Sequence, residues 1–427
     1  MLNQGESVFN AGLLDFYREH ATKTLLPFWK RAVDNEHGGI FTCFDNTGTQ
    51  LMSKNKYTWS QGRFIWIWSR IARISQAGLL SEEPEFYLVQ AKKTVDFLWQ
   101  HAVLENGNCA FVLTETGEPV EEIPGQGYDT SFYADCFVVL GFSEYVKATR
   151  DTEILKKALI LYDQIVKRLK QKNLRSEPYP IPEGVQAHSV SMIMLNVTHE
   201  LYEALSYLKH PRRQELKQAA LGHANDIMTV FYNADGTITE LLAPEGSPLQ
   251  DTVLCRHVNP GHTIECMWFI IQNVRKLGGT DWTHKAAKAV KRAFELGWDP
   301  EYGGLLRFVN RQGGKPQGTT NGDPYEKLIL DTWDTKLWWP HSEALYTTLL
   351  MYSVTGDETF LRLYEKTHTH VFTTFPNPDE TVGEWIQIRD RTGKPIQKVV
   401  ALPVKDPYHI LRNVLLTIEL IRENLSR

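Results

Sequence analysis

The stretch HGGIFTCFDNTG (37–48) is the first of five that share one pattern: glycine, an aromatic or branched pair, a short polar run, and a second glycine in a turn. The others are GNCAFVLTETGEP (107–119), ADGTITELLAPEGSP (234–248), YGGLLRFVNRQGGKP (302–316) and VGEWIQIRDRTGKP (382–395). Each is typical of a short hairpin. They recur at roughly 65 to 80 residues, apart from one double interval near whose centre RSEPYPIPEG (175–184) lies. About six structural units are therefore expected.

Amphipathic helices are expected between the hairpins, about two in each interval. Apolar residues recur at helical spacing in FYLVQAKKTVDFLWQHAV (86–103), DTEILKKALILYDQIVKRL (151–169), HKAAKAVKRAFELGW (284–298) and YHILRNVLLTIELIREN (408–424). Six helix pairs predict an all-α (α/α)6 toroid, with short β-hairpins at one rim and a central cleft. An open solenoid is the alternative, but it would leave an apolar face uncovered at each end. No low-complexity linker interrupts the chain, so residues 1–427 are expected to form a single domain.

The composition is that of an ordinary globular enzyme, with 42% hydrophobic residues, 23% charged residues and a net charge of -5. No basic block indicates a nucleic-acid partner, and no apolar run approaches the length of a membrane span. The N-terminal residues do not resemble a signal peptide. The five cysteines are scattered without a CxxC pair, which favours reduced thiols in the cytoplasm and argues against structural zinc. Neither HExxH, a P-loop nor a strand-anchored GxGxxG is present.

The segment RHVNPGHTIECMWF (256–269) contains the first candidate for proton transfer. Pro260 suits the first turn of a helix, so His262 and Glu265, three residues apart, should lie on one helical face. A histidine titrates near neutral pH and can both take and return a proton. The alternative interpretation is a hydrogen-bonded core histidine.

Two further histidines occupy comparable positions. His409 in VKDPYHILRN follows a proline at the start of the last amphipathic helix, and in a toroid it would share one cleft with His262. His188 precedes the apolar face of SMIMLNVTHEL, so it fits either the cleft or the core.

Other candidates combine charged and aromatic side chains. In KYTWSQGRFIWIW (56–68), Trp59 and Arg63 lie four residues apart on one face, and a buried arginine needs an anionic or oxyanion partner. That partner could also be a structural carboxylate. A sugar-binding platform is predicted from two aromatic-rich segments, DTWDTKLWWPHSEAL (331–345) and the last hairpin. Its members are Lys336, Trp338, Trp339, His341, Glu343, Glu384 and Trp385.

These segments, in this order, resemble the N-acylglucosamine 2-epimerase family, which includes renin-binding protein and is related to cellobiose and mannose 2-epimerases. The resemblance covers nearly the whole chain and rests on EHGGIFTC, KYTWSQGR, CAFVLTETGEPV, RHVNPGHTIECMWF, KLWWPHSEAL and GEW. It implies an (α/α)6 barrel and cofactor-independent inversion at C2 of a free sugar, with a homodimer as the expected assembly. It assigns His262 and His409 as the acid/base pair, Arg63 as an active-site arginine and Glu265 as a nearby carboxylate.

The implied chemistry agrees with the residues. Ring opening exposes an aldehyde, which makes the hydrogen on C2 abstractable because the resulting anion is an enolate. One histidine on each face of C2 could remove the proton from one side and return it to the other. Arg63, and also His188, would stabilise the oxygen that gains charge. The resemblance implies no metal.

The chain also departs from the family. After GEW it continues IQIRDR, where N-acetylglucosamine epimerases have an FGYLNR-like stretch, and PYH is closer to the cellobiose and mannose branch. N-acylated hexosamines and plain hexoses thus both stay open as substrates, and His188 keeps an aldose–ketose isomerase open. Glu265, Glu343 and Glu384 would be the acids of a glycoside hydrolase, a second class that leaves the paired histidines unexplained. A non-catalytic binding protein is the third class.

Overall fold

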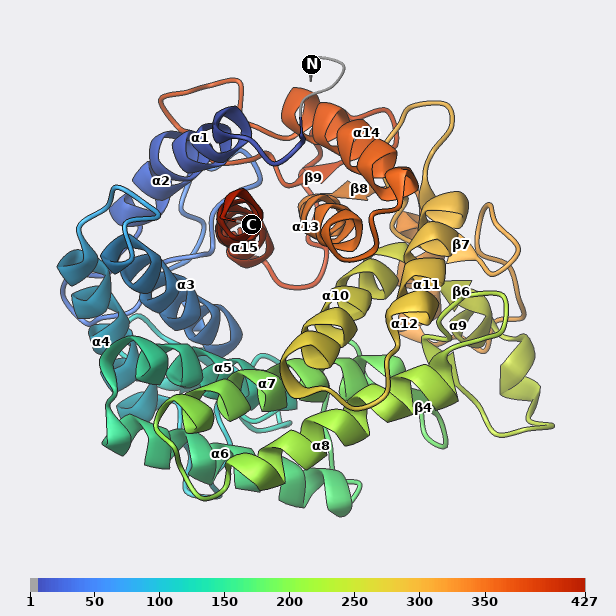
Figure 1. The fold of residues 1–427 in the computed structure, drawn as a ribbon. Helices are drawn as coiled ribbons and strands as arrows, with labels where there is room; N and C mark the ends of the chain where they lie inside the picture. The colour runs from blue at the N-terminus through green and yellow to red at the C-terminus, as the bar shows by residue number, and fades with distance from the viewer. Residues whose placement is uncertain (1–6, 427) are drawn as a thin grey trace.

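The computed structural model describes residues 7–426, which form a ring of paired helices (Figure 1). Residues 1–6, on which the expectation of no signal peptide partly depends, lie outside this range. The inner helices are α3 (Thr58–Gln76), α5 (Phe132–Thr149), α7 (His188–Tyr207), α10 (Pro260–Leu277), α13 (Trp338–Thr355) and α15 (Tyr408–Leu425). Outside them lie α1 (Ala11–Glu19), η1 (His20–Leu25), α2 (Leu26–Arg31), α4 (Pro84–His101), α6 (Thr152–Lys170), α8 (Arg213–Asp226), η2 (Ile227–Phe231), α11 (Thr283–Gly297) and α14 (Glu358–Thr374).

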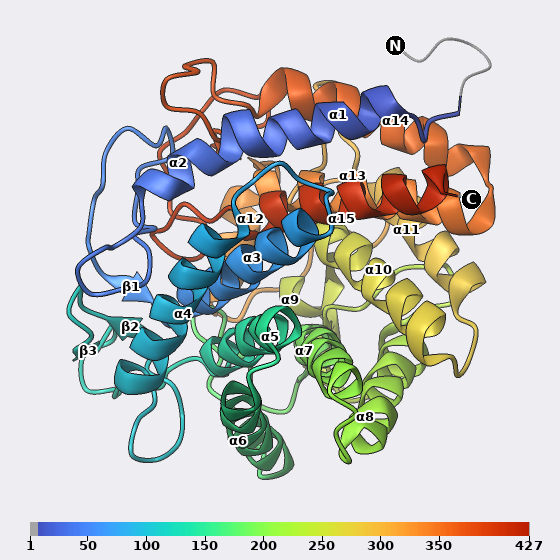
Figure 2. The same cartoon turned by 60° about the vertical axis from the view of Figure 1, so that its left-hand side comes forward.

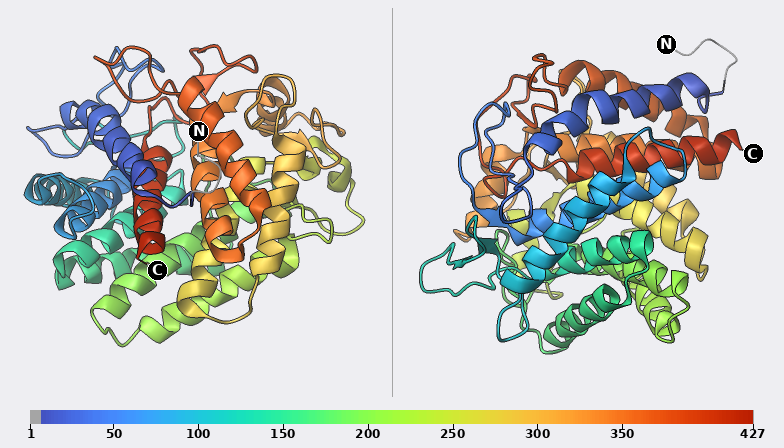
Figure 3. Two further views of the ribbon diagram at one scale, coloured as in Figure 1. Left: turned by 45° about the horizontal axis from the view of Figure 1, so that its top comes forward. Right: turned by 90° about the vertical axis from the view of Figure 1, so that its left-hand side faces the viewer.

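The inner helices contact one another in chain order, and α15 contacts both α13 and α3. Turned views show α1 alongside α15 (Figure 2, and Figure 3, blue beside red), α14 lies on the outside of α13 (Figure 1), and both pairs are in contact. The predicted all-α (α/α)6 toroid is therefore confirmed. Every helix among the described residues is too short or too polar to cross a membrane. All five cysteines are free thiols.

Burial distinguishes the two layers of helices. In the outer helix α11, buried residues such as Ala286, Ala289, Val290 and Ala293 recur three and four apart, which gives one buried stripe. In the inner helix α13 nearly every residue is buried, because it faces the outer layer on one side and the ring interior on the other. Glycine lets two inner helices approach closely, since a Cβ at Gly62 of α3 would lie 2.4 Å from the Phe137 carbonyl oxygen of α5.

The strands are two residues long and connect the repeats. Four strands precede inner helices, three of them directly and β6 by one residue: β1 (Lys56–Tyr57), β4 (Gln186–Ala187), β6 (His257–Val258) and β8 (Lys336–Leu337). Each pairs antiparallel with a strand in the next glycine-rich stretch, respectively β2 (Val112–Leu113), β5 (Leu241–Leu242), β7 (Val309–Asn310) and β9 (Ile388–Arg389). Ala187, for example, lies opposite Leu241. These pairs gather the glycine-rich stretches at the rim where the inner helices begin.

The expectation of a local hairpin in each stretch needs correction. Within the described residues only the second stretch contains two paired strands, β2 and β3 (Pro119–Val120). The others turn through isolated bridges such as Trp298 with Leu305. The segment near the missing repeat forms a single bridge, Ser176 with Ser131. The remaining short elements are η3 (Pro248–Asp251), α9 (Val253–Arg256) and α12 (Pro324–Thr332).

Candidate active site

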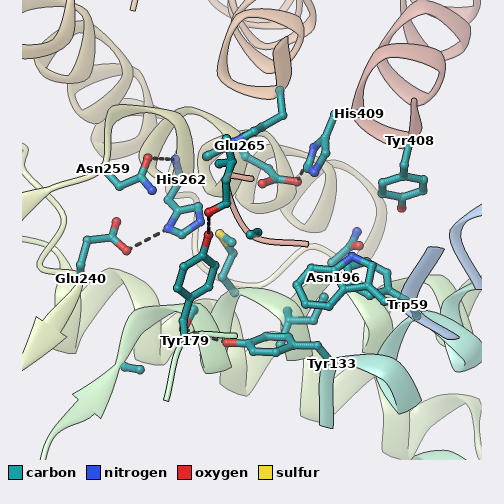
Figure 4. A pocket seen from close by; sticks show the side chains of 18 of the residues that line it. Trp59, Tyr133, Tyr179, Asn196, Glu240, Asn259, His262, Glu265, Tyr408 and His409 are labelled. Carbon is teal, nitrogen blue, oxygen red and sulfur yellow. Dashed lines mark hydrogen bonds and ion pairs between the residues drawn. The ribbon is translucent and has the colours of Figure 1, made fainter. Parts of the chain in front are cut away.

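A cavity of about 200 Å³ lies where the inner helices begin (Figure 4). Each inner helix contributes a lining residue from its first turn: Trp59, Tyr133, Ser189, His262, Trp338 and His409. Loops supply other parts of the wall, among them Tyr179, Arg307 and Val400. Because the positive ends of six helix dipoles meet here, the cavity favours developing negative charge.

His262 lies on the cavity wall in contact with a buried carboxylate. Its backbone N–H donates to the N-cap Asn259 Oδ1 at 3.1 Å, which fixes the start of α10. Its Nδ1 lies 2.9 Å from Oε2 of Glu240, a residue from the third glycine-rich stretch (Figure 4). Burial opposes charge on the ring, but the Glu240 carboxylate outweighs it and raises the pKa of His262. Glu240 therefore favours the protonated form of the ring, and Nε2 has no hydrogen-bond partner among the described residues.

Glu240 is buried and remains ionised. Burial alone would raise its pKa, but His262 and then His188 lower the pKa of Glu240 well below its usual range. His188 is fully buried, with Nε2 3.4 Å from Cys266 Sγ and Nδ1 3.9 Å from Glu240 Oε1. It does not line the cavity, so its predicted contact with substrate is not supported. It packs behind Glu240 instead.

His409 has the opposite surroundings. Its Nδ1 lies 2.7 Å from Glu343 Oε1, and its Nε2 lies 3.4 Å from an Nη2 donor of Arg63. The 2.7 Å contact of Nδ1 with the Glu343 carboxylate, which only accepts, places the proton on Nδ1. Arg412 Nη2, 3.3 Å from Nδ1, donates to the same Glu343 oxygen, so the lone pair is left on Nε2, which faces the Arg63 donor. Burial, reinforced by Arg63 and Arg412 against the opposing effect of Glu265, lowers the pKa of His409 to about 3. His409 is thus a neutral imidazole with its lone pair on the side of Arg63.

Two carboxylates behind His409 share one arginine. Arg412 Nη2 lies 2.5 Å from both Glu265 Oε1 and Glu343 Oε1, and Trp268 Nε1 donates to Glu343 Oε2 at 2.7 Å. Glu265, Glu343 and His409 offer atoms within 4.8 Å of one another, a spacing that could suit a metal. The guanidinium already supplies the positive charge between the carboxylates, and His409 Nδ1 needs its proton for Glu343. We therefore interpret this cluster as an ion-pair network that orients His409.

The aromatic residues predicted as a platform divide into two groups. Trp59, Trp338 and Trp339 line the cavity. The Trp339 ring lies between the two histidines, with centroids 5.3 Å from His262 and 5.6 Å from His409. Gly261 makes this possible, because a Cβ there would lie 2.6 Å from the Trp339 ring. One indole therefore adjoins both acid/base candidates.

Lys336 and His341 do not line the cavity, in contrast to the prediction. Lys336 is buried with Nζ 3.3 Å from Asp299. His341 Nε2 accepts from the Leu305 N–H at 2.8 Å, so its Nδ1 carries the proton and donates to the Leu337 carbonyl at 2.6 Å. Lys336 and His341 thus connect the start of α13 to the fourth glycine-rich stretch and to Asp299 just before it.

Glu384 and Trp385 are likewise away from the cavity wall. The Glu384 carboxylate lies 3.0 Å from Lys405 Nζ, and Trp385 Nε1 donates to His20 Nε2 at 2.8 Å. Their partners are remote in sequence, so no local pattern indicates that these groups are already satisfied.

Several wall residues were not predicted. Glu240 lies in a stretch that the sequence predicts only as a hairpin, and the one local feature that marks it is a carboxylate directly before two leucines. Arg412 follows His409 by three residues on one helical face, which is a usable signal. Tyr179 and Arg307, from different loops at the rim, are hydrogen-bonded to each other: Arg307 Nη2 donates to the Tyr179 hydroxyl at 3.2 Å. The Tyr179 hydroxyl in turn donates to the Val400 carbonyl at 3.0 Å. No local sequence pattern brings these loops together.

Comparison with known proteins identifies the family and the fold. Residues 39–413 match the model of the family described as N-acylglucosamine 2-epimerase. The chain is 31% identical over 412 residues to the N-acylglucosamine 2-epimerase of Homo sapiens, covering 94% of this chain and 89% of the human protein. Its fold is similar to that of cellobiose 2-epimerase from Bacillus thermoamylovorans, with a TM-score of 0.75 and 20% identity over 96% of this chain and 100% of the other. A D-mannose isomerase structure gives a TM-score of 0.74 at 17% identity, over 97% and 99% of the two chains.

Proposed function

The chain belongs to the N-acylglucosamine 2-epimerase family, and from this membership we propose that it is an isomerase that inverts C2 of a free reducing sugar. The substrate would be of the N-acyl-D-glucosamine/N-acyl-D-mannosamine or the D-glucose/D-mannose type. One observation carries the proposal: His262 and His409 line the same cavity, and their surroundings shift their pKa values in opposite directions, upward for His262 and downward for His409. Pairs of titratable groups with opposite shifts are what acid/base chemistry requires.

The proposed reaction starts from the open-chain sugar. Neutral His409 removes the C2 proton with its Nε2 lone pair, and the C–H electrons move into an enolate whose charge rests on the oxygen of C1. Protonated His262 then gives a proton to C2 from the other face, which inverts the centre. In the reverse direction the two histidines exchange roles. Arg63, which lines the same cavity beside His409, would donate to the enolate oxygen.

The carboxylates behind His409 argue against a hydrolase. Inverting and retaining glycosidases need two carboxyl groups on either side of the scissile bond, one of them a protonated acid. Glu265 and Glu343 instead share the same Arg412 nitrogen, and Glu384 is paired with Lys405 away from the cavity. None of the three is placed as a free acid across a substrate bond.

An apolar part of the wall favours the acylated sugar. Ala187 and Leu241 pair across β4 and β5 beside Glu240, and Met192 and Ile193 of α7 continue this surface. An acyl methyl group would bury apolar area here, whereas a plain C2 hydroxyl would lack a partner on these four side chains.

We further propose that residues 1–427 act as one catalytic domain in a cytoplasmic homodimer. Light scattering on the purified protein tests the assembly. A mass of a single chain would remove the dimer from the proposal.

The reaction is tested by incubating the enzyme in deuterated water with N-acetylmannosamine, N-acetylglucosamine, mannose, glucose or cellobiose, each followed by proton NMR. We expect a C2 epimer with deuterium at C2, fastest with the N-acetyl sugars. A ketose product would instead identify an aldose–ketose isomerase. Release of reducing sugar from a glycoside would indicate a hydrolase, and sugar binding without any turnover would indicate a binding protein.

A further inference from the structure

Arg63 is held on one side by a buried carboxylate. Its Nη1 donates to Asp406 Oδ2 at 2.6 Å, and its other Nη faces His409 Nε2 at 3.4 Å. The guanidinium lies over the rings of Phe137, Tyr408 and Trp59, 4.1 to 4.9 Å from their centroids. Stacking and ion pairing together leave one edge of Arg63 directed at the proposed base.

Asp406 is itself fixed through its backbone. The side-chain amide of Gln387, from β9's glycine-rich stretch, accepts from the Asp406 N–H and donates to the Asp406 carbonyl, both at 3.1 Å. Gln387 is only 2% exposed. The other carboxylate oxygen, Oδ1, accepts from the Tyr408 N–H at 2.8 Å and so fixes the first turn of α15. One residue thus connects the arginine, the last hairpin and the helix that carries His409.

A second buried contact holds the same loop. Lys405 Nζ lies 3.0 Å from the Glu384 carboxylate, and Gln387 Nε2 lies 3.2 Å from Glu384 Oε1. Glu384 has a φ of 62°, in the left-handed region that a residue other than glycine adopts only under constraint. The surrounding contacts therefore impose this backbone conformation, and the loop that they hold keeps Asp406 in place beside Arg63.

We propose that Asp406, clamped by Gln387, is a positioning residue that acts through Arg63. The inference rests on the proposed function, because the group that it positions serves the proton transfer at His409. Asp406 has two effects. It orients a single guanidinium edge toward the base and the enolate oxygen, and it supplies a permanent counter-anion, so that Arg63 does not capture other anions from solution. Without it, the cavity would hold an unpaired guanidinium, which binds phosphate or carboxylate readily.

The test uses Asp406→Asn, which keeps the side-chain oxygen that caps α15 but removes the charge that holds Arg63. We expect kcat to fall at least about tenfold with a smaller change in KM, because the arginine's contribution is made in the transition state. Inorganic phosphate should become a competitive inhibitor that binds at least about tenfold more tightly than to the wild type. Asp331→Asn, which removes an exposed charge, is the control and should change neither quantity.

The dependence on Arg63 separates positioning from a general structural role. In an Arg63→Met background, Asp406→Asn should leave both phosphate affinity and residual turnover nearly unchanged, since the two residues act as one unit. Equal losses with and without Arg63, or unaltered phosphate binding in Asp406→Asn, would overturn the proposal. Gln387→Met, which loses both bonds to Asp406, should shift phosphate affinity in the same direction by a smaller factor and provides the test if Asp406→Asn does not fold. Phosphate affinity is measured by calorimetry without sugar, so this result is independent of whether the epimerase assignment stands.

Discussion

Replacing Glu240 by glutamine should move the alkaline limit of activity. Glu240 is 5% exposed and lies 2.9 Å from His262, and its charge is the main influence that raises the pKa of His262 against burial. A unit charge at this range contributes about 4 kcal/mol at an effective dielectric constant of about 20. The His262 side chain is 25% exposed, so solvent screening reduces the contribution of the Glu240 charge to about 1.4 to 2.8 kcal/mol.

The sign of the shift follows from the protonation states. Both directions of the reaction use the state in which the two histidines share one proton, so activity is lost at high pH when His262 loses that proton. With Glu240 replaced, burial and Arg307 are opposed by Glu265 alone, so the pKa of His262 falls. The alkaline limb of kcat/KM should therefore move to lower pH in both directions, and on that limb kcat/KM should lie about 10- to 100-fold below the wild type, the factor that corresponds to about 1.4 to 2.8 kcal/mol.

The assay is the pH dependence of kcat/KM for both epimers, with Glu245→Gln as the control because Glu245 is an exposed carboxylate in the same glycine-rich stretch. An alkaline limb that stays in place in Glu240→Gln would refute the assignment of His262 as the proton donor held by Glu240. A limb that moves equally in the control would show that the shift reflects overall charge.

Three further predictions follow from buried contacts. Glu343→Gln removes the negative charge of the carboxylate that accepts from His409 Nδ1 and that is one of two carboxylates bound to Arg412. We expect kcat to fall about 10- to 100-fold and the free energy of unfolding in urea to fall by about 1 to 3 kcal/mol. Unchanged kcat would exclude a role of Glu343 in orienting His409. Lys336→Met leaves buried Asp299 with fewer partners, so Tm should drop while KM stays within about twofold; a large rise in KM would restore Lys336 to the substrate site. Burial lowers the pKa values of His20, His368 and His370 to about 4, so the unfolded chain binds more protons below pH 6.5, and stability measured by urea unfolding should fall between pH 6.5 and about 4; a flat profile across that window would contradict it.

The repeat of glycine-rich stretches was sufficient to predict the number and pairing of the helices. It did not predict the strand pairings, because strands such as β4 and β5 have only two residues each and pair over a long sequence separation. Position at a helix start was informative, since His262 and His409 each follow a proline and both reach the cavity. Whether a residue lies at the rim depends on whether it lies at the start of a helix, and this can be inferred from the local sequence.

The partners of buried polar side chains could not be inferred from the local sequence. Lys336, Glu384 and Trp385 were predicted to face a sugar, and their partners Asp299, Lys405 and His20 lie 20 or more residues away in the chain. Glu240 was not predicted for the same reason, because its contact with His262 depends on the packing of a turn against a helix. Charged and aromatic side chains in one short segment thus indicated a rim, but not which of them face the cavity.

One histidine is proposed to serve each face of C2, and exchange of the C2 hydrogen in His262→Asn and His409→Asn tests this assignment. Each variant should lose epimerisation while keeping its fold by circular dichroism, and should still exchange the C2 hydrogen of one epimer with deuterated water. The two variants should exchange opposite epimers, because each keeps the base for one face. Exchange of the same epimer by both variants, or epimerisation by either, would contradict it.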